Sequence, residues 1–221
     1  MGRAGLAIGG VALIGVGIAF GLGWFWPATA EATATVEQRI SRVELAGDSG
    51  DVLVRADESA ETTTVRQRFR YRWGEPDEAY EVRDGTLTLS GCGSWCSVDY
   101  EVIVPEGTTV SGSVDSGDLT LDGVSDVQVE ADSGDFTGTR LRGAVDVSVD
   151  SGDVRVTLDE PRDVRLAADS GDVEVTVPDG SYRVLGTTDS GDREIGVTQD
   201  PAASTVLDLN TDSGDVTVHA A

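Results

Sequence analysis

The sequence predicts an all-β protein, a β-solenoid of about seven stacked coils behind a single N-terminal transmembrane helix. Three observations predict this fold. The tetrapeptide Asp-Ser-Gly-Asp occurs seven times, and a repeat of roughly twenty residues is typical of stacked structural units. Valine-rich alternation of apolar and polar residues flanks the copies, as in β-strands. A long uncharged apolar stretch precedes all of the repeats.

The apolar stretch, residues 5–26, is long enough to cross a bilayer as a helix. Trp24 and Trp26 lie where an interfacial aromatic belt belongs, and Arg3 is on the side expected to stay in the cytoplasm. We therefore expect residues 1–27 to form a cytoplasmic N-terminus and a single-pass anchor in the cell membrane, with the C-terminal domain extracellular. The alternative is a signal peptide cleaved near an Ala-Thr-Ala sequence, which would give a secreted protein.

The rest of the chain divides by composition. Residues 28–36 are mostly small and show no periodic pattern, so they predict a short linker. Residues 37–221 then form the β-strand-repeat ectodomain. Within it, residues 59–109 depart from the repeat and hold most of the aromatic side chains of this domain. An irregular section of this kind suits the end coil of a solenoid, which has to cover an otherwise exposed core.

The repeats themselves predict strand–turn–strand units. Val145, Val147 and Val149 alternate before one copy, and Val154 and Val156 follow it. Parallel stacking of such coils would bury one column of valines on each face. An antiparallel meander or sandwich, with each tetrapeptide at a hairpin tip, is the alternative. The near-equal coil lengths favour the solenoid. The seven copies start at Asp48, Asp115, Asp132, Asp150, Asp169, Asp189 and Asp212.

Stacked corners would place like aspartates about 4.8 Å apart, so their mutual repulsion has to be offset. In a structural corner, the first aspartate accepts turn amides and the glycine takes a positive φ. This interpretation is favoured because the copies lack the Gly-Gly-x-Gly-x-Asp form of calcium-binding repeats. No cofactor is then expected. The alternative is Ca²⁺ bridging the carboxylates. Its candidate ligands are Asp115, Asp118, Asp132, Asp135, Asp150, Asp153, Asp169 and Asp172.

Two further features lie in the irregular section. In an exported chain, the close pair Cys92 and Cys96 predicts a disulfide that shapes a small loop. Four arginines alternate along one predicted strand and would share a face, which is a candidate site for an anionic polymer or lipid headgroup. These are Arg66, Arg68, Arg70 and Arg72. The alternative is cross-strand pairing with nearby carboxylates, namely those of Glu78, Glu81, Asp99 or Glu101.

Composition excludes several classes of function. A net charge of −24 argues against nucleic acid as a partner. The sequence has one histidine, His219, and no serine with a nearby base, so no nucleophile–base pair is evident. Phosphate-cradling glycine motifs are also absent from the sequence. The carboxylates repeat so regularly that no pair is singled out for glycoside hydrolysis. We do not expect an enzyme.

The repeated Ser-Gly-Asp corners, Leu87-Thr88-Leu89, the cysteine loop and residues 100–105 together resemble the bacterial "putative adhesin" family of β-strand-repeat domains of unknown function. This resemblance implies a β-solenoid at the cell surface and brings no catalytic residues. It favours a non-enzymatic, membrane-anchored extracellular module that binds a cell-envelope polymer or a surface protein. The alternatives are a structural or sensory ectodomain in envelope-stress signalling and a carbohydrate-active enzyme.

Overall fold

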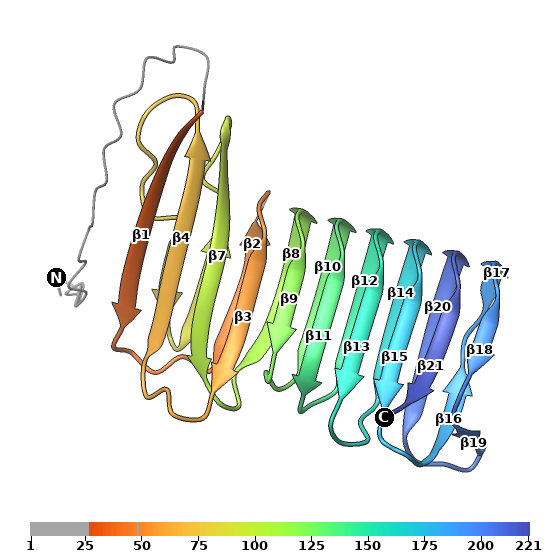
Figure 1. The fold of residues 1–221 in the computed structure, drawn as a ribbon. Coiled ribbons are helices and arrows are strands. Elements are labelled where there is room, and N and C mark those ends of the chain that lie inside the picture. The colour runs from red at the N-terminus through yellow and green to blue at the C-terminus, as the bar shows by residue number, and fades with distance from the viewer. Residues whose placement is uncertain (1–26, 48) are drawn as a thin grey trace, which may run out of the picture.

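The computed structural model describes residues 27–47 and 49–221. The predicted membrane anchor in residues 5–26, and Asp48, lie outside the described residues. The described chain is all-β, and two sheets face each other along the whole stack (Figure 1). The prediction of an all-β solenoid is confirmed.

One sheet, sheet A, has ten strands. In spatial order they are β1 (Ala28–Val36), β4 (Thr63–Tyr71), β7 (Cys96–Pro105), β3 (Val52–Asp57), β9 (Leu119–Asp122), β11 (Phe136–Leu141), β13 (Val154–Leu158), β15 (Val173–Val177), β21 (Val216–Ala220) and β18 (Arg193–Ile195).

The other sheet, sheet B, has eleven strands. Its main order is β19 (Thr198–Gln199), β16 (Ser181–Leu185), β20 (Val206–Ser213), β14 (Val164–Ser170), β12 (Val145–Ser151), β10 (Val127–Ser133), β8 (Thr109–Ser116), β2 (Arg42–Gly47), β6 (Thr86–Ser90) and β5 (Tyr80–Arg83). The short β17 (Thr188–Ser190) also pairs with β20.

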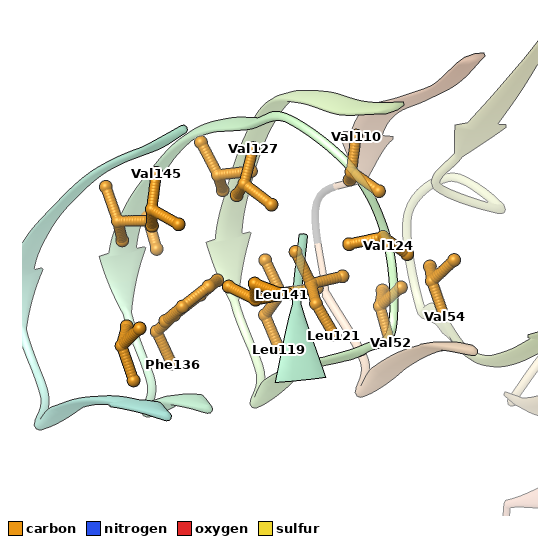
Figure 2. Packing of buried hydrophobic residues seen from close by; sticks show 14 of the residues in the cluster. Val52, Val54, Val110, Leu119, Leu121, Val124, Val127, Phe136, Leu141 and Val145 are labelled. Atoms are coloured by element: carbon orange, nitrogen blue, oxygen red, sulfur yellow. The ribbon is translucent and has the colours of Figure 1, made fainter. Parts of the chain in front are cut away.

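Each repeat forms one coil, in which a strand of sheet B leads through the Asp-Ser-Gly-Asp corner into a strand of sheet A. Neighbouring coils pair in parallel and in register, so that Val145 lies opposite Val164 and Val154 opposite Val173. The alternating valines point inward and are buried between the sheets (Figure 2). Antiparallel pairing among the described strands is confined to β1–β4–β7 and β5–β6, so the repeats do not form the alternative meander.

The coils do not stack strictly in chain order. Coil β2–β3 pairs with coil β8–β9, while the segment between them, from β4 to β7, lies outside it at the end of the stack. At the opposite end, coil β20–β21 lies between coil β14–β15 and the strands β16 to β18. The 67-residue gap between the first two corners is therefore the segment that covers one end of the core.

Residues 28–36 are not a linker. They form the nine-residue strand β1, which pairs along its whole length with β4, from Ala28 opposite Tyr71 to Val36 opposite Thr63. The alternation of alanine and threonine escaped the sequence analysis because it lacks bulky apolar residues. Ala30 and Ala32 nonetheless pack against the core, so this segment is part of the folded domain.

The core of coil β10–β11 contains one large aromatic side chain, Phe136, which is 1% exposed. Two residues later, Gly138 leaves space that Phe136 and Leu141 fill, since an added Cβ would lie 2.7 Å from Leu141 Cδ1 and 3.1 Å from Phe136 Cε1. Between them, Arg140 has a φ of +52°, and the strand register shifts there. This bulge turns Leu141 into the core, where it is also 1% exposed (Figure 2).

Candidate functional site

The corners are held by backbone contacts between coils. Gly134 illustrates the geometry: its φ is +121°, and a Cβ at this position would lie 2.2 Å from the carbonyl oxygen of Gly117 in the next coil. Its own amide donates to the carbonyl oxygen of Ser151 at 2.9 Å on the other side. The expected positive φ of the corner glycine is confirmed. Close approach of the coils is a second reason why only glycine fits here.

The second aspartate of each corner joins neighbouring coils. Its Oδ1 accepts the backbone amide of the equivalent aspartate one coil further along, and we call this series the aspartate ladder. It passes through Asp99, Asp51, Asp118, Asp135, Asp153, Asp172, Asp215 and Asp192, with donor–acceptor distances of 2.8–3.2 Å. Asp99 lies outside the tetrapeptides and continues the series in β7. The hydrogen bond from the Asp172 amide lowers the pKa of Asp153; burial opposes this effect, and Arg155 reinforces it.

The first aspartates of the corners behave differently where the structure describes them. Asp115, Asp132, Asp150 and Asp169 are exposed, and their carboxylates accept no hydrogen bond from the residues that the structure describes. The expectation that the first aspartate accepts turn amides is wrong: the acceptor is the second aspartate, and the donor belongs to the next coil. Within residues 27–47 and 49–221, no group of three or more His, Cys, Asp or Glu side chains could hold a metal ion. The structure therefore gives no support to a calcium site at these corners.

The predicted arginine face is largely engaged within the protein. Arg66, Arg68 and Arg70 project from β4 on one face, but their guanidinium groups contact carboxylates on both neighbouring strands. Glu31 of β1 binds Arg66 at 3.2 Å and Arg68 at 3.0 Å. Of the partners expected from sequence, Glu101 contacts Arg66 at 3.5 Å and Asp99 contacts Arg70 at 3.0 Å. Glu78 and Glu81 form no ion pair with these arginines.

The hydrogen bond from Arg66, followed by that from Arg68, lowers the pKa of Glu31. Glu31 was missed because its segment was interpreted as a linker. The fourth arginine, Arg72, lies beyond the end of β4, is exposed, and has no carboxylate partner among the described residues. The four predicted residues thus do not form one free cationic surface.

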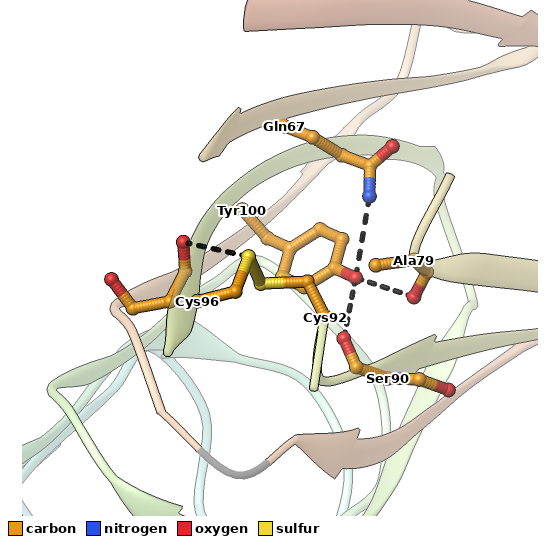
Figure 3. Close-up of a disulfide and its surroundings, with 7 residues drawn as sticks. Gln67, Ala79, Ser90, Cys92, Cys96 and Tyr100 are labelled. Atoms are coloured by element: carbon orange, nitrogen blue, oxygen red, sulfur yellow. Dashed lines mark hydrogen bonds between the residues drawn. A yellow bond between two sulfur atoms is a disulfide. The ribbon is translucent and has the colours of Figure 1, made fainter. Parts of the chain in front are cut away.

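The predicted disulfide between Cys92 and Cys96 is confirmed, and its loop replaces the corner between β6 and β7 (Figure 3). The hydroxyl of Tyr100 lies below this loop, 2.5 Å from the carbonyl oxygen of Ala79 and 2.7 Å from that of Ser90. Burial raises the pKa of Tyr100 well above its ordinary value, so the phenol stays protonated and its single hydrogen can be donated to either carbonyl. The hydrogen bonds of Tyr100 therefore have a structural role, because they attach the irregular segment to the end of the stack.

A shallow groove lies on the outer face of sheet B. It has a volume of about 660 Å³ and crosses β2, β8, β10, β12, β14 and β20 near the ends where these strands begin. Parallel register aligns one outward row of polar side chains along it, at a spacing of about 4.8 Å. This row is Ser111, Gln128, Asp146, Arg165 and Asp208.

The groove also contains Arg42 and two aspartates that close the coils. Asp126 accepts the amide of Ala144, and Asp163 accepts the amide of Val206, both at 2.9 Å. Neither Arg42 nor Arg165 forms an ion pair with any residue of the described chain, unlike the three arginines on β4. Sequence reasoning missed this surface because its residues lie one per coil. Aligning the repeats on their corners would have brought Gln128, Asp146 and Arg165 into one column.

A stack of parallel coils with two facing sheets defines the class of this protein as a two-sheeted β-solenoid. The family model of Toastrack DUF4097 matches residues 80–219, so the chain belongs to this family. No curated protein matches the sequence. No helix in residues 27–47 or 49–221 is long and apolar enough to cross a membrane.

Two solved structures are similar in fold. One is a "putative cell adhesion protein" from Clostridium sporogenes ATCC 15579, with a TM-score of 0.53 and 15% identity over 88% of this chain and 100% of the other. The second is a "putative adhesin" from Bacteroides fragilis NCTC 9343, with a TM-score of 0.51 and 12% identity over 89% of this chain and 100% of the other. At these identities the similarity extends to the fold alone.

Proposed function

We propose that this protein is a non-catalytic, membrane-anchored β-solenoid that binds an extended polar polymer of the cell envelope, outside the membrane, in the groove of sheet B. The observation that carries the proposal is the polar row in the groove. Its side chains repeat at the spacing of the coils, and the groove that contains it holds two guanidinium groups, those of Arg42 and Arg165, with no ion-pair partner in the described chain. The names of the similar solved structures agree with a binding role. The apolar sequence of residues 5–26 supports the membrane anchoring in this proposal.

The chemistry of the groove favours an uncharged, hydroxyl-rich chain. Four carboxylates (Asp126, Asp146, Asp163 and Asp208) accompany two guanidinium groups, and the whole protein carries a charge of −24. A strongly anionic polymer would be repelled. Hydroxyl groups of a neutral glycan can instead donate to the carboxylates and accept from arginine and glutamine. The groove spans five coil steps, about 24 Å, which suits an extended ligand.

The test compares two triple variants of the full chain in phosphatidylcholine vesicles, applied to an array of neutral and anionic polysaccharides. The groove variant carries Gln128→Ala, Asp146→Ala and Arg165→Ala. The control variant carries Thr137→Ala, Arg155→Ala and Glu174→Ala, which likewise remove one uncharged polar, one basic and one acidic side chain, here from an aligned row on sheet A. We expect the groove variant to lose about tenfold or more in affinity for a neutral polysaccharide, because three hydrogen-bonding side chains are removed. Equal binding by both variants would overturn the assignment of the groove.

A further inference from the structure

Two tryptophans are far more exposed than any other large apolar side chain that the structure describes. Trp73 is 76% exposed and Trp95 is 73% exposed, while the next, Leu185 at the other end of the stack, is 45% exposed. Both lie at the same end of sheet A, since Tyr71 pairs with Cys96 and the amide of Arg72 donates to the carbonyl oxygen of Trp95 at 3.1 Å, which places Trp73 one residue beyond this pair. We call Arg72, Trp73 and Trp95 the tryptophan end. Two highly exposed indoles at one end of a sheet indicate an interaction site.

Trp95 has an unusual backbone conformation that the disulfide loop restrains. Its φ is +68°, a conformation that costs energy for a bulky residue and persists only when the surroundings enforce it. The Cys92–Cys96 disulfide closes the loop that contains Trp95, and the Cys96 amide donates to the carbonyl oxygen of Gly93 at 3.3 Å. The disulfide and this hydrogen bond restrain the loop in the conformation in which Trp95 is exposed.

The register of β1 places the start of the folded domain at this same end. Ala28, the first residue of β1, pairs with Tyr71, the last residue of β4 (Figure 1). In the sequence, the apolar stretch ends at Trp26, so only Pro27 separates it from β1. Two residues of extended chain span at most about 7 Å. A membrane anchor in residues 5–26 would therefore bring the tryptophan end to the bilayer surface. This inference rests on the anchor, as the proposed function does.

We propose that the tryptophan end docks on the lipid headgroup layer, with both indoles in the membrane interface and Arg72 beside the lipid phosphates. Tryptophan favours this interface because one part of the ring is apolar and the N–H remains hydrogen-bonded. Arg72 is exposed and has no carboxylate partner among the described residues, so its guanidinium is available to phosphate.

The tryptophan end also carries negative charge, because Glu75, Asp77 and Glu78 are exposed in the loop that follows Trp73, so the expected surface is a zwitterionic lipid such as phosphatidylcholine. The aspartate ladder reaches β7 at Asp99, three residues from Cys96, so the acidic corners stand back from the tryptophan end by about 10 Å. This distance is about one Debye length at physiological salt, so repulsion between the corners and anionic headgroups is largely screened. Sheet B strands begin at the opposite ends, so the groove lies at the end of the sheet that is farther from the membrane.

The experiment uses the full chain in phosphatidylcholine vesicles. The sequence contains four tryptophans, so Trp24→Phe and Trp26→Phe leave Trp73 and Trp95 as the only indoles. We expect blue-shifted emission and strong quenching by nitroxide-labelled lipid headgroups. The matched control adds Trp73→Phe, Trp95→Phe and Glu61→Trp. Glu61 is exposed and precedes β4 at the far end of the sheet, so an indole there should remain in water.

Quenching of Trp73 and Trp95 several-fold stronger than that of the control indole supports docking. Equal quenching of the two, in a chain that floats with the vesicles and resists alkaline carbonate, overturns docking and leaves the anchor intact. A chain that does not float with the vesicles overturns both docking and the membrane-anchored function. Individual Trp73→Phe and Trp95→Phe substitutions then show which indole accounts for the signal.

Discussion

The two aspartates of each corner differ in their partners. The carboxylate of Asp118 accepts the amide of Asp135 at 3.0 Å, whereas that of Asp115 is exposed and accepts no hydrogen bond within the described chain. Both belong to rows of like charges about one coil step apart, so both experience repulsion. Only the second aspartate has a hydrogen bond to offset it. Identical residue types three positions apart therefore have opposite expected effects on stability.

Asp118→Ala should lower the free energy of unfolding by about 1 kcal/mol, because an amide loses its charged acceptor. Asp115→Ala, three residues away in the same corner, should leave the stability unchanged or raise it slightly, because it removes one repelling charge. Urea unfolding midpoints of the full chain in detergent, taken at low salt, measure both effects. An equal loss at both positions would contradict the distinct roles of the two aspartates.

At the scale of the strand and coil, alternation in the sequence predicted most of the repeat strands, since their valines give a clear two-residue period. The corner glycines and the disulfide were equally evident from residue type and spacing. Strand β1 was not, because small residues give little hydrophobic signal although β4 pairs with them closely. Asp99 was also missed, since it continues the aspartate ladder from outside the repeated tetrapeptide.

The coil containing β11 depends on one aromatic side chain to fill the space beside Gly138. Phe136→Ala should lower the free energy of unfolding by about 3–5 kcal/mol, since a buried ring is lost and stacked coils on both sides restrict collapse of the cavity. Thr137→Ala, on the outward face of the same strand, should change it by less than about 0.5 kcal/mol. Thermal or urea unfolding followed by circular dichroism compares the two. A small effect of Phe136→Ala would show that the core of this coil is loosely packed.

At the scale of the whole molecule, the order of the coils could not be predicted from the sequence. The seven corners are nearly identical, so each could stack on any other. The sequence pattern therefore does not show whether coil β20–β21 or the strands β16 to β18 form the terminal unit. The groove has the same origin: each coil contributes one or two ordinary polar residues, and only their alignment produces a surface. At both ends of the stack the coils are placed out of chain order, which is why copies far apart in sequence become neighbours.

The fold and the two proposals together define an orientation. The corners, the tryptophan end and the start of β1 lie at one edge of the solenoid, along the top of Figure 1, and the groove lies toward the other edge. A docked tryptophan end therefore turns the acidic corners toward the membrane and the groove toward the exterior. The strands then stand along the membrane normal, and the axis of the stack lies along the membrane plane.

The most direct test of this orientation places a single dye at either end of one strand. Gln128 and Asp132 are both exposed on β10, about 13 Å apart along the strand, and the two native cysteines are already joined in a disulfide. Gln128→Cys and Asp132→Cys variants of the full chain, labelled and reconstituted in vesicles, are compared by energy transfer to acceptors on the lipid headgroups. The account predicts clearly stronger transfer from position 132 than from position 128. Equal transfer, or stronger transfer from position 128, would contradict it.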